Sequence, residues 1–247
     1  MIAIKTLEQI EKISYSGKIL SKLFQILENR IKPGITTEAL NEIAEEYMEK
    51  RGIKPAFKGY KGFPAALCVS VNEEVVHGIP SKRALEEGDI VSIDMGAIHK
   101  GFFSDAARTY SVGQISTLKQ KLIAVTRKSL DIAISNMSEK NKLFDISHSI
   151  EEYVGNNGFS VVRDFVGHGI GEKMHEDPQI PNFGVPDTGP QLEIGMVFAI
   201  EPMVNMGTSE VEVLGDHWTV VTKDKMPSAH FEDTIAITDK GPVILTR

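Results

Sequence analysis

The sequence has few of the residues and patterns that mark several common protein classes. It contains one cysteine, Cys68, among 247 residues, which excludes an intrachain disulfide framework and a cysteine-rich zinc finger. Its apolar runs are short, and none approaches the ~20 residues needed to span a bilayer. Acidic residues outnumber basic ones by 34 to 27, and the resulting net charge of −7 argues against a dedicated DNA- or RNA-binding protein. We therefore expect neither a DNA partner nor a membrane partner.

Several catalytic and targeting motifs are also missing. No phosphate-binding P-loop and no G-x-S-x-G nucleophile elbow occurs. His175-Glu176 begins like the zinc motif H-E-x-x-H, but Gln179 stands where the second histidine belongs and Pro178 would break the helix. The first residues, MIAIKTLEQIEKI, lack a basic segment followed by a long apolar one, so we expect a cytoplasmic protein without a secretory signal.

The remaining pattern is that of an ordinary globular α+β protein, with 41% hydrophobic and 25% charged residues. Apolar periodicity and capping residues predict helices over 6–31, from Thr37 to Gly52, over 117–137 and over 143–156. Alternation and turn residues predict strands over 65–76, 89–98, 101–112, 159–167, 196–206, 211–223 and 230–237. Two helices thus precede a block of strands twice, which indicates a duplicated α+β unit.

Two aspartates lie in neighbouring predicted strands, where this residue type is uncommon. Asp94 occurs in IVSIDMG and Asp105 in FFSDAARTY. A hairpin turn at His99-Lys100 would place the two carboxylates directly opposite each other, and like charges in that arrangement repel. Such a pair requires a shared proton, an arginine or a metal ion.

Three residues repeat this feature in the second half. Glu201 follows an apolar run, Glu232 precedes another apolar strand, and His168 lies between two glycines that allow close backbone approach. Taken singly, each has a plainer interpretation, as a carboxylate on a solvated strand face or a histidine in a turn. Four converging carboxylates would need about four positive charges, which two divalent cations supply. Oxygen ligands with one imidazole suit Mn²⁺, Fe²⁺, Co²⁺ or Zn²⁺, although the spacing alone leaves convergence open.

Five segments together resemble type I methionine aminopeptidases, in order and over essentially the whole chain. They are VNEEVVHGIP (71–80), VSIDMGAIHKGFFSDAARTY (91–110), VGHGIGEKMHEDPQIPN (166–182), GMVFAIEPM (195–203) and SAHFEDTIAIT (228–238). The resemblance implies an α+β pita-bread fold, in which two pseudo-symmetric halves with antiparallel sheet surround a dinuclear metal site and helices lie outside. It also implies that residues 1–247 form a single catalytic domain.

The resemblance further implies a ligand set. Asp94 would bind one ion, His168 and Glu201 the other, and Asp105 and Glu232 both. Two divalent ions per chain are expected, with the choice among Co, Mn, Fe, Zn and Ni left open. They would activate a water molecule for attack on the peptide bond.

Residues outside the ligand set carry over from the resemblance as well. His77, His175 and Glu201 would be catalytic, with His77 at the scissile amide, His175 at the oxyanion and Glu201 handling the proton of the water molecule. The methionine side chain would be bound by His77, His175, Cys68, Tyr60, Phe63 and Trp218. Two positions depart from the usual pattern, since Met174 stands where phenylalanine is common and Phe63 where tyrosine is expected.

The implied function is metal-dependent hydrolysis that removes the initiator methionine from nascent proteins and peptides with a small second residue. Two alternatives remain, a prolidase-like or Xaa-Pro aminopeptidase and a non-catalytic binding protein of the same fold. The partners expected are nascent polypeptide N-termini, with the chain itself a monomer. Arg51, Lys54, Lys58 and Lys61 form either a solvated basic loop or a transient ribosome contact.

Overall fold

The structure, a computed structural model, describes residues 2–247, and three of its four α-helices begin after a residue whose side chain caps them. The helices are α1 (Leu7–Glu28), α2 (Thr37–Glu49), α3 (Thr117–Ser135), α4 (Leu143–Asn156) and a short 3₁₀ turn, η1 (Tyr60–Gly62). Thr6 and Gln9 form the predicted capping box of α1. Thr36, rather than the predicted Thr37, caps α2 by accepting from the Ala39 N–H group. None of these helices is long and apolar enough to cross a membrane.

Every strand pairing among residues 2–247 is antiparallel, and the strands form four small sheets. The first holds β1 (Lys54–Pro55), β2 (Cys68–Val71), β4 (Ile90–His99) and β5 (Phe102–Ser111). The second holds β6 (Ser160–Val161), β10 (Met203–Asn205) and β13 (Ser228–His230), and the third holds β3 (Glu74–Val76), β11 (Val211–Val213) and β12 (Val220–Thr222). The fourth holds β7 (Gly167–Gly169), β8 (Glu176–Ile180), β9 (Val197–Ile200), β14 (Asp233–Thr238) and β15 (Gly241–Ile244).

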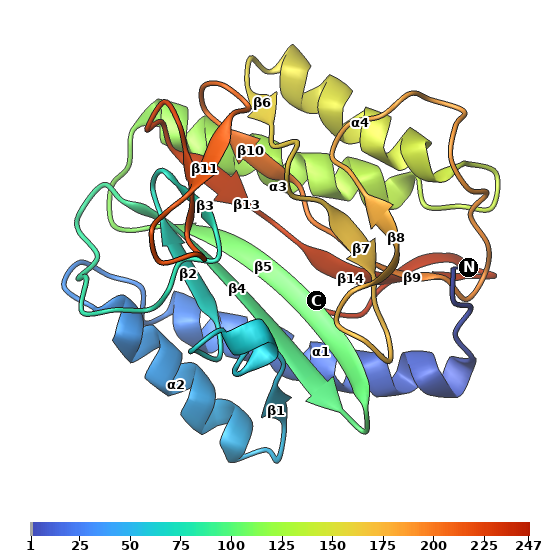
Figure 1. Cartoon of the computed structure of the whole chain (residues 1–247), viewed down its shortest axis with the longest axis horizontal. Coiled ribbons are helices and arrows are strands. Elements are labelled where there is room, and N and C mark those ends of the chain that lie inside the picture. Colours follow the sequence, from blue (N-terminus) through green and yellow to red (C-terminus); the bar gives the residue numbers. More distant parts are fainter. Residues whose placement is uncertain (1) are drawn as a thin grey trace.

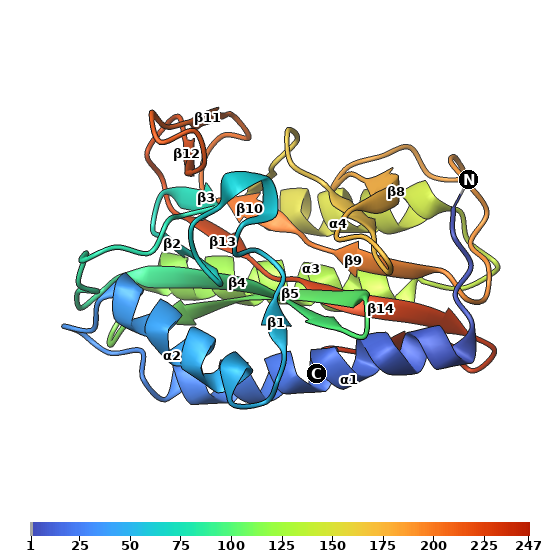
Figure 2. The ribbon, with the colours of Figure 1, turned by 60° about the horizontal axis from the view of Figure 1, so that its bottom comes forward.

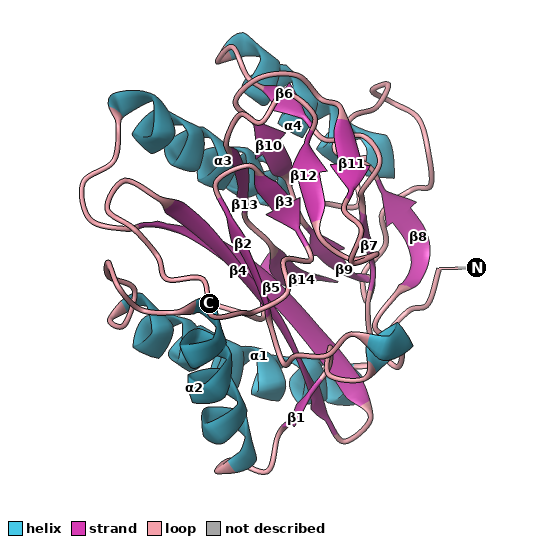
Figure 3. Cartoon of the chain, turned by 60° about the vertical axis from the view of Figure 1, so that its left-hand side comes forward, coloured by secondary structure: helices cyan, strands magenta, loops and turns pink. Residues whose placement is uncertain are grey.

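The two helix pairs lie on opposite sides of the strands, and each pair packs on its own half. In Figure 1, α1 and α2 lie below β4 and β5, whereas α3 and α4 lie at the top of the view. Figure 3 shows the same separation of helices around the central strands. One apolar cluster joins α1 and α2 to β2, β4 and β5, and a second joins α3 and α4 to β9, β10, β13 and β14. The predicted duplicated α+β architecture is confirmed.

The long hairpin of β4 and β5 has a different register from the one predicted. The turn consists of Lys100 and Gly101, both with positive φ (49° and 82°), and His99 pairs with Phe102. Positive φ at both positions is the requirement of a type I′ two-residue loop, and Gly101 adopts this conformation without steric cost. Asp94 therefore faces Ala107, and Asp105 faces Gly96. The prediction that the two aspartates are directly opposed was wrong, but they share one face as diagonal neighbours.

The two halves meet along a short seam beside β5. Ala107 and Glu232 exchange backbone hydrogen bonds in an isolated bridge, and Asp105 and Thr234 are joined by two further bonds at 2.8 and 2.9 Å. Arg108 donates to the carbonyl of Glu232 and to Asp233 Oδ1. This seam fixes β5 of the first half against the β13–β14 segment of the second. In Figure 2, β5 and β14 run side by side above α1.

Two helical glycines allow the closeness of this packing to be tested. A Cβ atom added to Gly17 in α1 would lie 2.2 Å from the Leu245 carbonyl oxygen, whereas one added to Gly155 in α4 would meet nothing within 4 Å. Alanine usually stabilises a helix by up to ~1 kcal/mol relative to glycine. We expect Gly155→Ala to stabilise the fold slightly and Gly17→Ala to destabilise it by about 1–3 kcal/mol.

Urea-induced unfolding of both variants measures the difference. Equal stabilisation by the two substitutions would contradict the close approach of α1 to the C-terminal segment.

Candidate metal centre and active site

A cavity of about 180 Å³ between the two halves brings together side chains that are far apart in the sequence. Its acidic side is lined by the five expected ligands, and its apolar side by aromatic and sulfur-containing residues. The lining residues are Phe57, Tyr60, Lys61, Phe63, Cys68, His77, Asp94, Asp105, His168, Met174, His175, Glu201, Trp218 and Glu232. All residues named as candidate site residues from the sequence are among them.

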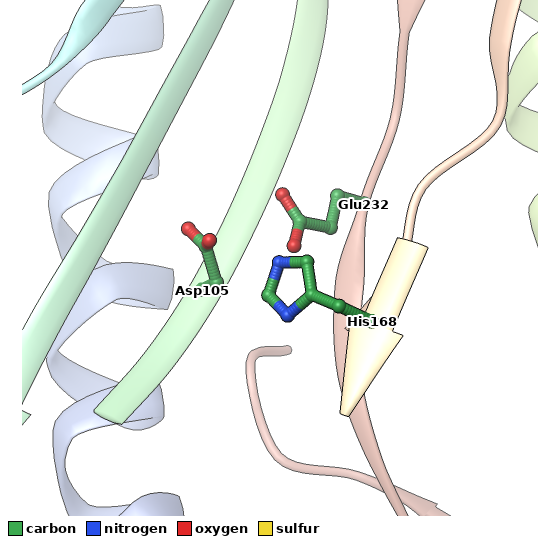
Figure 4. A group of neighbouring side chains, drawn as sticks. All are labelled: Asp105, His168 and Glu232. Carbon is green, nitrogen blue, oxygen red and sulfur yellow. The ribbon is translucent and has the colours of Figure 1, made fainter. Parts of the chain in front are cut away.

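Three of the candidate ligands form a compact group (Figure 4). Asp105 comes from β5, His168 from β7 and Glu232 from the segment between β13 and β14. Each offers one ligand atom, and these atoms lie within 4.8 Å of one another. The exposed fractions of the three residues are only 4%, 6% and 1%. The three side chains could therefore hold a metal ion between them.

The other two candidate ligands adjoin this group. Asp94 projects from β4 on the face that carries Asp105. Glu201 follows β9, and its Oε1 atom lies 3.6 Å from Nε2 of His168. The five side chains therefore converge from β4, β5, β7, the end of β9 and the β13–β14 segment.

Burial and repulsion between neighbouring groups raise the pKa values of these carboxyl groups. Burial raises the pKa of Asp94 to about 7. The pKa of Asp105 is also raised, first by burial and then by Asp94 and Glu201. Burial and nearby carboxylates likewise raise the pKa values of Glu201 and Glu232. Without cations, the folded chain favours protonation of these groups.

The donor atoms fit divalent metal ions. Asp94 Oδ1 and Glu232 Oε1 are buried and have no hydrogen-bond partner in the described chain. His168 Nδ1 lies 2.9 Å from the Gly169 carbonyl oxygen, to which it donates, so Nε2 is the nitrogen directed at Glu201. Burial and His175 lower the pKa of His168 to about 4, which keeps its imidazole neutral. Four carboxylates and one neutral imidazole form a hard, anionic ligand set that suits such ions.

The apolar side of the cavity is a packed cluster. Phe63 contacts Trp218 edge to face at 5.1 Å between ring centroids, and Phe57 at 6.5 Å. Cys68 and Met174 belong to the same cluster and are each 3% exposed. Burial and the neighbouring carboxylates raise the pKa of the Cys68 thiol well above its usual range, so this group stays neutral. The cavity therefore joins an anionic wall to a lipophilic one.

The two candidate catalytic histidines flank the acidic group. His77 has a positive φ of 59°, and its ring packs edge to face against Phe165 and Trp218. Burial and His175 lower the pKa of His77 to about 4. His175 is exposed at the mouth of the cavity, 4.3 Å from the His168 ring centroid, and its Nδ1 atom lies 2.9 Å from the Tyr60 hydroxyl.

Two residues behind the acidic group were not predicted from the sequence. His230 is 1% exposed, and its Nε2 atom lies 3.7 Å from Glu201 Oε2. Arg108 is fixed beneath Glu232 by Asp233 and by backbone carbonyls. The signal for them in the sequence was their position, since His230 lies two residues before Glu232 and Arg108 lies three residues after Asp105. Its meaning depended on tertiary contacts that spacing does not give.

Comparison with known proteins identifies similar sequences and structures over the whole chain. Residues 11–239 match the model of metallopeptidase family M24. The chain is 54% identical to a methionine aminopeptidase of Clostridium perfringens, covering 100% of this chain and 99% of the relative. A crystal structure of a Thermotoga maritima methionine aminopeptidase superposes with a TM-score of 0.99 at 49% identity and covers 100% of both chains. The expected pita-bread fold is confirmed.

A more distant structure bears on the alternative hypothesis. A prolidase from Pyrococcus furiosus superposes with a TM-score of 0.81 at 24% identity, and the match covers 99% of this chain but 65% of the prolidase. At this identity the similarity concerns the fold alone.

The raised carboxyl pKa values predict a pH dependence for the metal-free chain. A group whose pKa is higher in the folded state than in the unfolded state stabilises the fold at low pH. For Asp94 this contribution is lost as the pH rises from its ordinary pKa of 3.8 through about 7. Between about pH 4 and pH 8, we expect the metal-free chain to lose about 1–3 kcal/mol more stability than Asp94→Asn does.

Urea unfolding in the presence of a chelator measures both pH profiles. Parallel profiles for the two proteins would contradict the raised pKa of Asp94. Addition of Mn²⁺ to the unsubstituted chain should remove most of its loss at high pH.

Proposed function

Since this chain belongs to metallopeptidase family M24, we propose that it is a methionine aminopeptidase that removes the N-terminal methionine from nascent proteins and peptides. The observation that carries the proposal is one cavity in which five potential metal ligands face an apolar pocket. The similarity to methionine aminopeptidases over the full length of the chain supports the same conclusion.

The proposed site holds two divalent ions. Asp94 would bind the first and His168 with Glu201 the second, while Asp105 and Glu232 would bind both. Four buried carboxylates supply about four negative charges, which two divalent ions balance and a single ion does not. When bound, such ions lower the pKa of a shared water molecule and polarise the scissile carbonyl.

The protein side chains then orient the substrate and move protons. Glu201, which lines the cavity and is itself one of the proposed ligands, would also accept the proton of the attacking water molecule. His77, held neutral beside the apolar wall, would contact the scissile amide and assist departure of the amine. His175, at the cavity mouth, would donate a hydrogen bond to the oxyanion that forms as the carbonyl is attacked.

The apolar wall would select the first residue of the substrate. Phe63, Trp218 and Cys68 present aromatic and sulfur surface, which packs favourably with the thioether of methionine. Met174 belongs to this wall and can adjust its shape because methionine is flexible. The small cavity of about 180 Å³ favours a small second residue in the substrate.

The two alternative functions have less support. For the prolidase-like alternative, the prolidase from Pyrococcus furiosus shares the fold, and this chain matches 65% of that protein. For a non-catalytic binding protein, retention of five potential ligands in one cavity is unexpected.

The remaining expectations stay predictions. These are the single catalytic domain, the monomeric state, the cytoplasmic location, the identity of the metal and a transient ribosome contact. In the proposed contact region, Lys58 pairs with Glu45 and Lys61 lines the cavity.

Peptide specificity and metal content together test the proposal. The chain loaded with Mn²⁺ or Co²⁺ should cleave Met-Ala-Ser by about 10²-fold or more faster than Met-Lys or Xaa-Pro peptides. Asp105→Ala and Glu232→Ala should lose bound metal and activity, because each removes a ligand shared by both ions. Metal analysis and release of free methionine are the measurements. Preferential cleavage of Xaa-Pro peptides would support the prolidase-like alternative, and full activity without metal would contradict both.

The role of His175 gives a second kinetic prediction. His175→Ala should lower kcat by roughly 10²–10³, as expected for loss of one oxyanion donor, and leave metal content unchanged. His148→Ala is the matched control, because His148 lies on α4 and does not line the cavity. Loss of metal from His175→Ala would show that its assignment as an oxyanion donor is wrong.

A further inference from the structure

A lysine in the segment before α1 is buried against the loop that carries His175. Lys5 is 7% exposed, and its Nζ atom forms an ion pair with Oε2 of Glu176, the residue directly after His175. The side chains of the pair are 5% and 12% exposed. A lysine and a glutamate are rarely buried this deeply unless they are paired.

Glu176 uses its second oxygen to close the loop on itself. Its Oε1 atom accepts a hydrogen bond of 3.1 Å from the Lys173 N–H group, so the carboxylate spans the two residues between them, Met174 and His175. The pair also occupies the space beside Gly171, where an added Cβ would lie 2.3 Å from Lys5 Cε and 3.0 Å from Glu176 Oε1. The loop therefore packs around the ion pair.

The backbone of Lys5 is held by a hydrogen bond on one side and by the start of α1 on the other. Its N–H group donates to the Gly195 carbonyl oxygen at 2.7 Å, just before β9, and the next residue, Thr6, caps α1. Gly195 has a φ of +90°, and an added Cβ would lie 2.6 Å from Ile4 Cγ2 and 2.9 Å from the Lys5 carbonyl oxygen. Lys5 thus connects a helix start and a strand entry to the His175 loop.

The loop has little other support on its outer side. There it faces a second cavity of about 670 Å³, lined by residues 3–5, Glu172, Lys173 and His175 among others. His175 itself is exposed, and the Tyr60 hydroxyl, on another loop, is its hydrogen-bond partner within the described chain. The Tyr60 ring also stacks on the imidazole, at 5.5 Å between ring centroids.

We propose that Lys5 is a positioning residue for His175, and that the Lys5–Glu176 ion pair fixes the loop so that the imidazole stays over the reacting centre. The inference rests on the proposed function, which gives His175 its catalytic role. Removal of Lys5 leaves an uncompensated buried carboxylate, which the loop relieves by moving Glu176 toward water. A displacement of about 1 Å in a catalytic group is enough to lower the rate by ~10²-fold.

A kinetic double-mutant cycle tests the proposal in the metal-loaded full chain. Lys5→Met should lower kcat for Met-Ala-Ser by about 10–100-fold, with KM and metal content unchanged. In the His175→Ala background, the same substitution should lower kcat by less than about twofold, because the group it positions is gone. Lys12→Met, which breaks an exposed pair with Glu8, is the matched control and should leave kcat unchanged.

A second variant and a second measurement keep the test independent of folding and of activity. Glu176→Gln retains an acceptor for the Lys173 N–H group and removes only the charge, so it should reproduce the loss in kcat in a milder form. In the metal-free chain, the NMR signals of the His175 ring should shift or broaden in Lys5→Met, whereas those of His148 should not.

The outcomes distinguish failure of the positioning role of Lys5 from failure of the proposed catalytic role of His175. Additive losses in the double variant, an unchanged kcat in Lys5→Met or unchanged His175 ring signals would overturn the positioning role and leave the proposed function intact. An unchanged kcat in His175→Ala alone would contradict the catalytic role of His175 and the positioning role together.

Discussion

Repulsion among four carboxyl groups in one cavity is the constraint on which the rest of the structure depends. Burial raises the pKa of each of Asp94, Asp105, Glu201 and Glu232, and repulsion from neighbouring carboxylates raises those of Asp105, Glu201 and Glu232 further. A flexible framework would relieve this repulsion by turning the side chains to water. Here short antiparallel strands from both halves hold the groups in place, and the helix pairs outside them supply the apolar packing that keeps the strands together.

The seam between the halves contains the contacts that hold these repelling carboxyl groups in place. Glu232 contacts β5 through its backbone, while Arg108 and Asp233 form a buried ion pair directly behind it. The arginine adds positive charge close to the acidic cavity without entering it. Its hydrogen bond to the Glu232 carbonyl oxygen also fixes the position of Glu232 beside β5. The same side chain therefore joins β5 to the segment that carries Glu232.

Local sequence patterns were sufficient for the four α-helices, but they missed β8 and β15 and the turns that divide 65–76 and 211–223 into two strands each. The contacts between elements were not visible in them. The Thr6–Gln9 capping box predicted the start of α1 correctly because all its atoms lie within one helical turn. The β4–β5 hairpin was recognised, but its register was misjudged since the positive φ of Lys100 allowed a two-residue loop. His230 and Lys5 were missed because their partners, Glu201 and Glu176, are distant in sequence. The convergence of the five ligands rested on family resemblance, since spacing alone left it open.

The seam has a consequence for the order in which the chain becomes functional during its synthesis. Asp94 and Asp105 are translated first, whereas Glu232, which lies in one ligand group with Asp105, is translated long after both. Until then, the acidic strands of the first half have no opposing wall and lie open to water. A chain synthesised only to residue 200 could fold its first helix pair, yet it would lack Glu201 and Glu232 of the candidate ligand group.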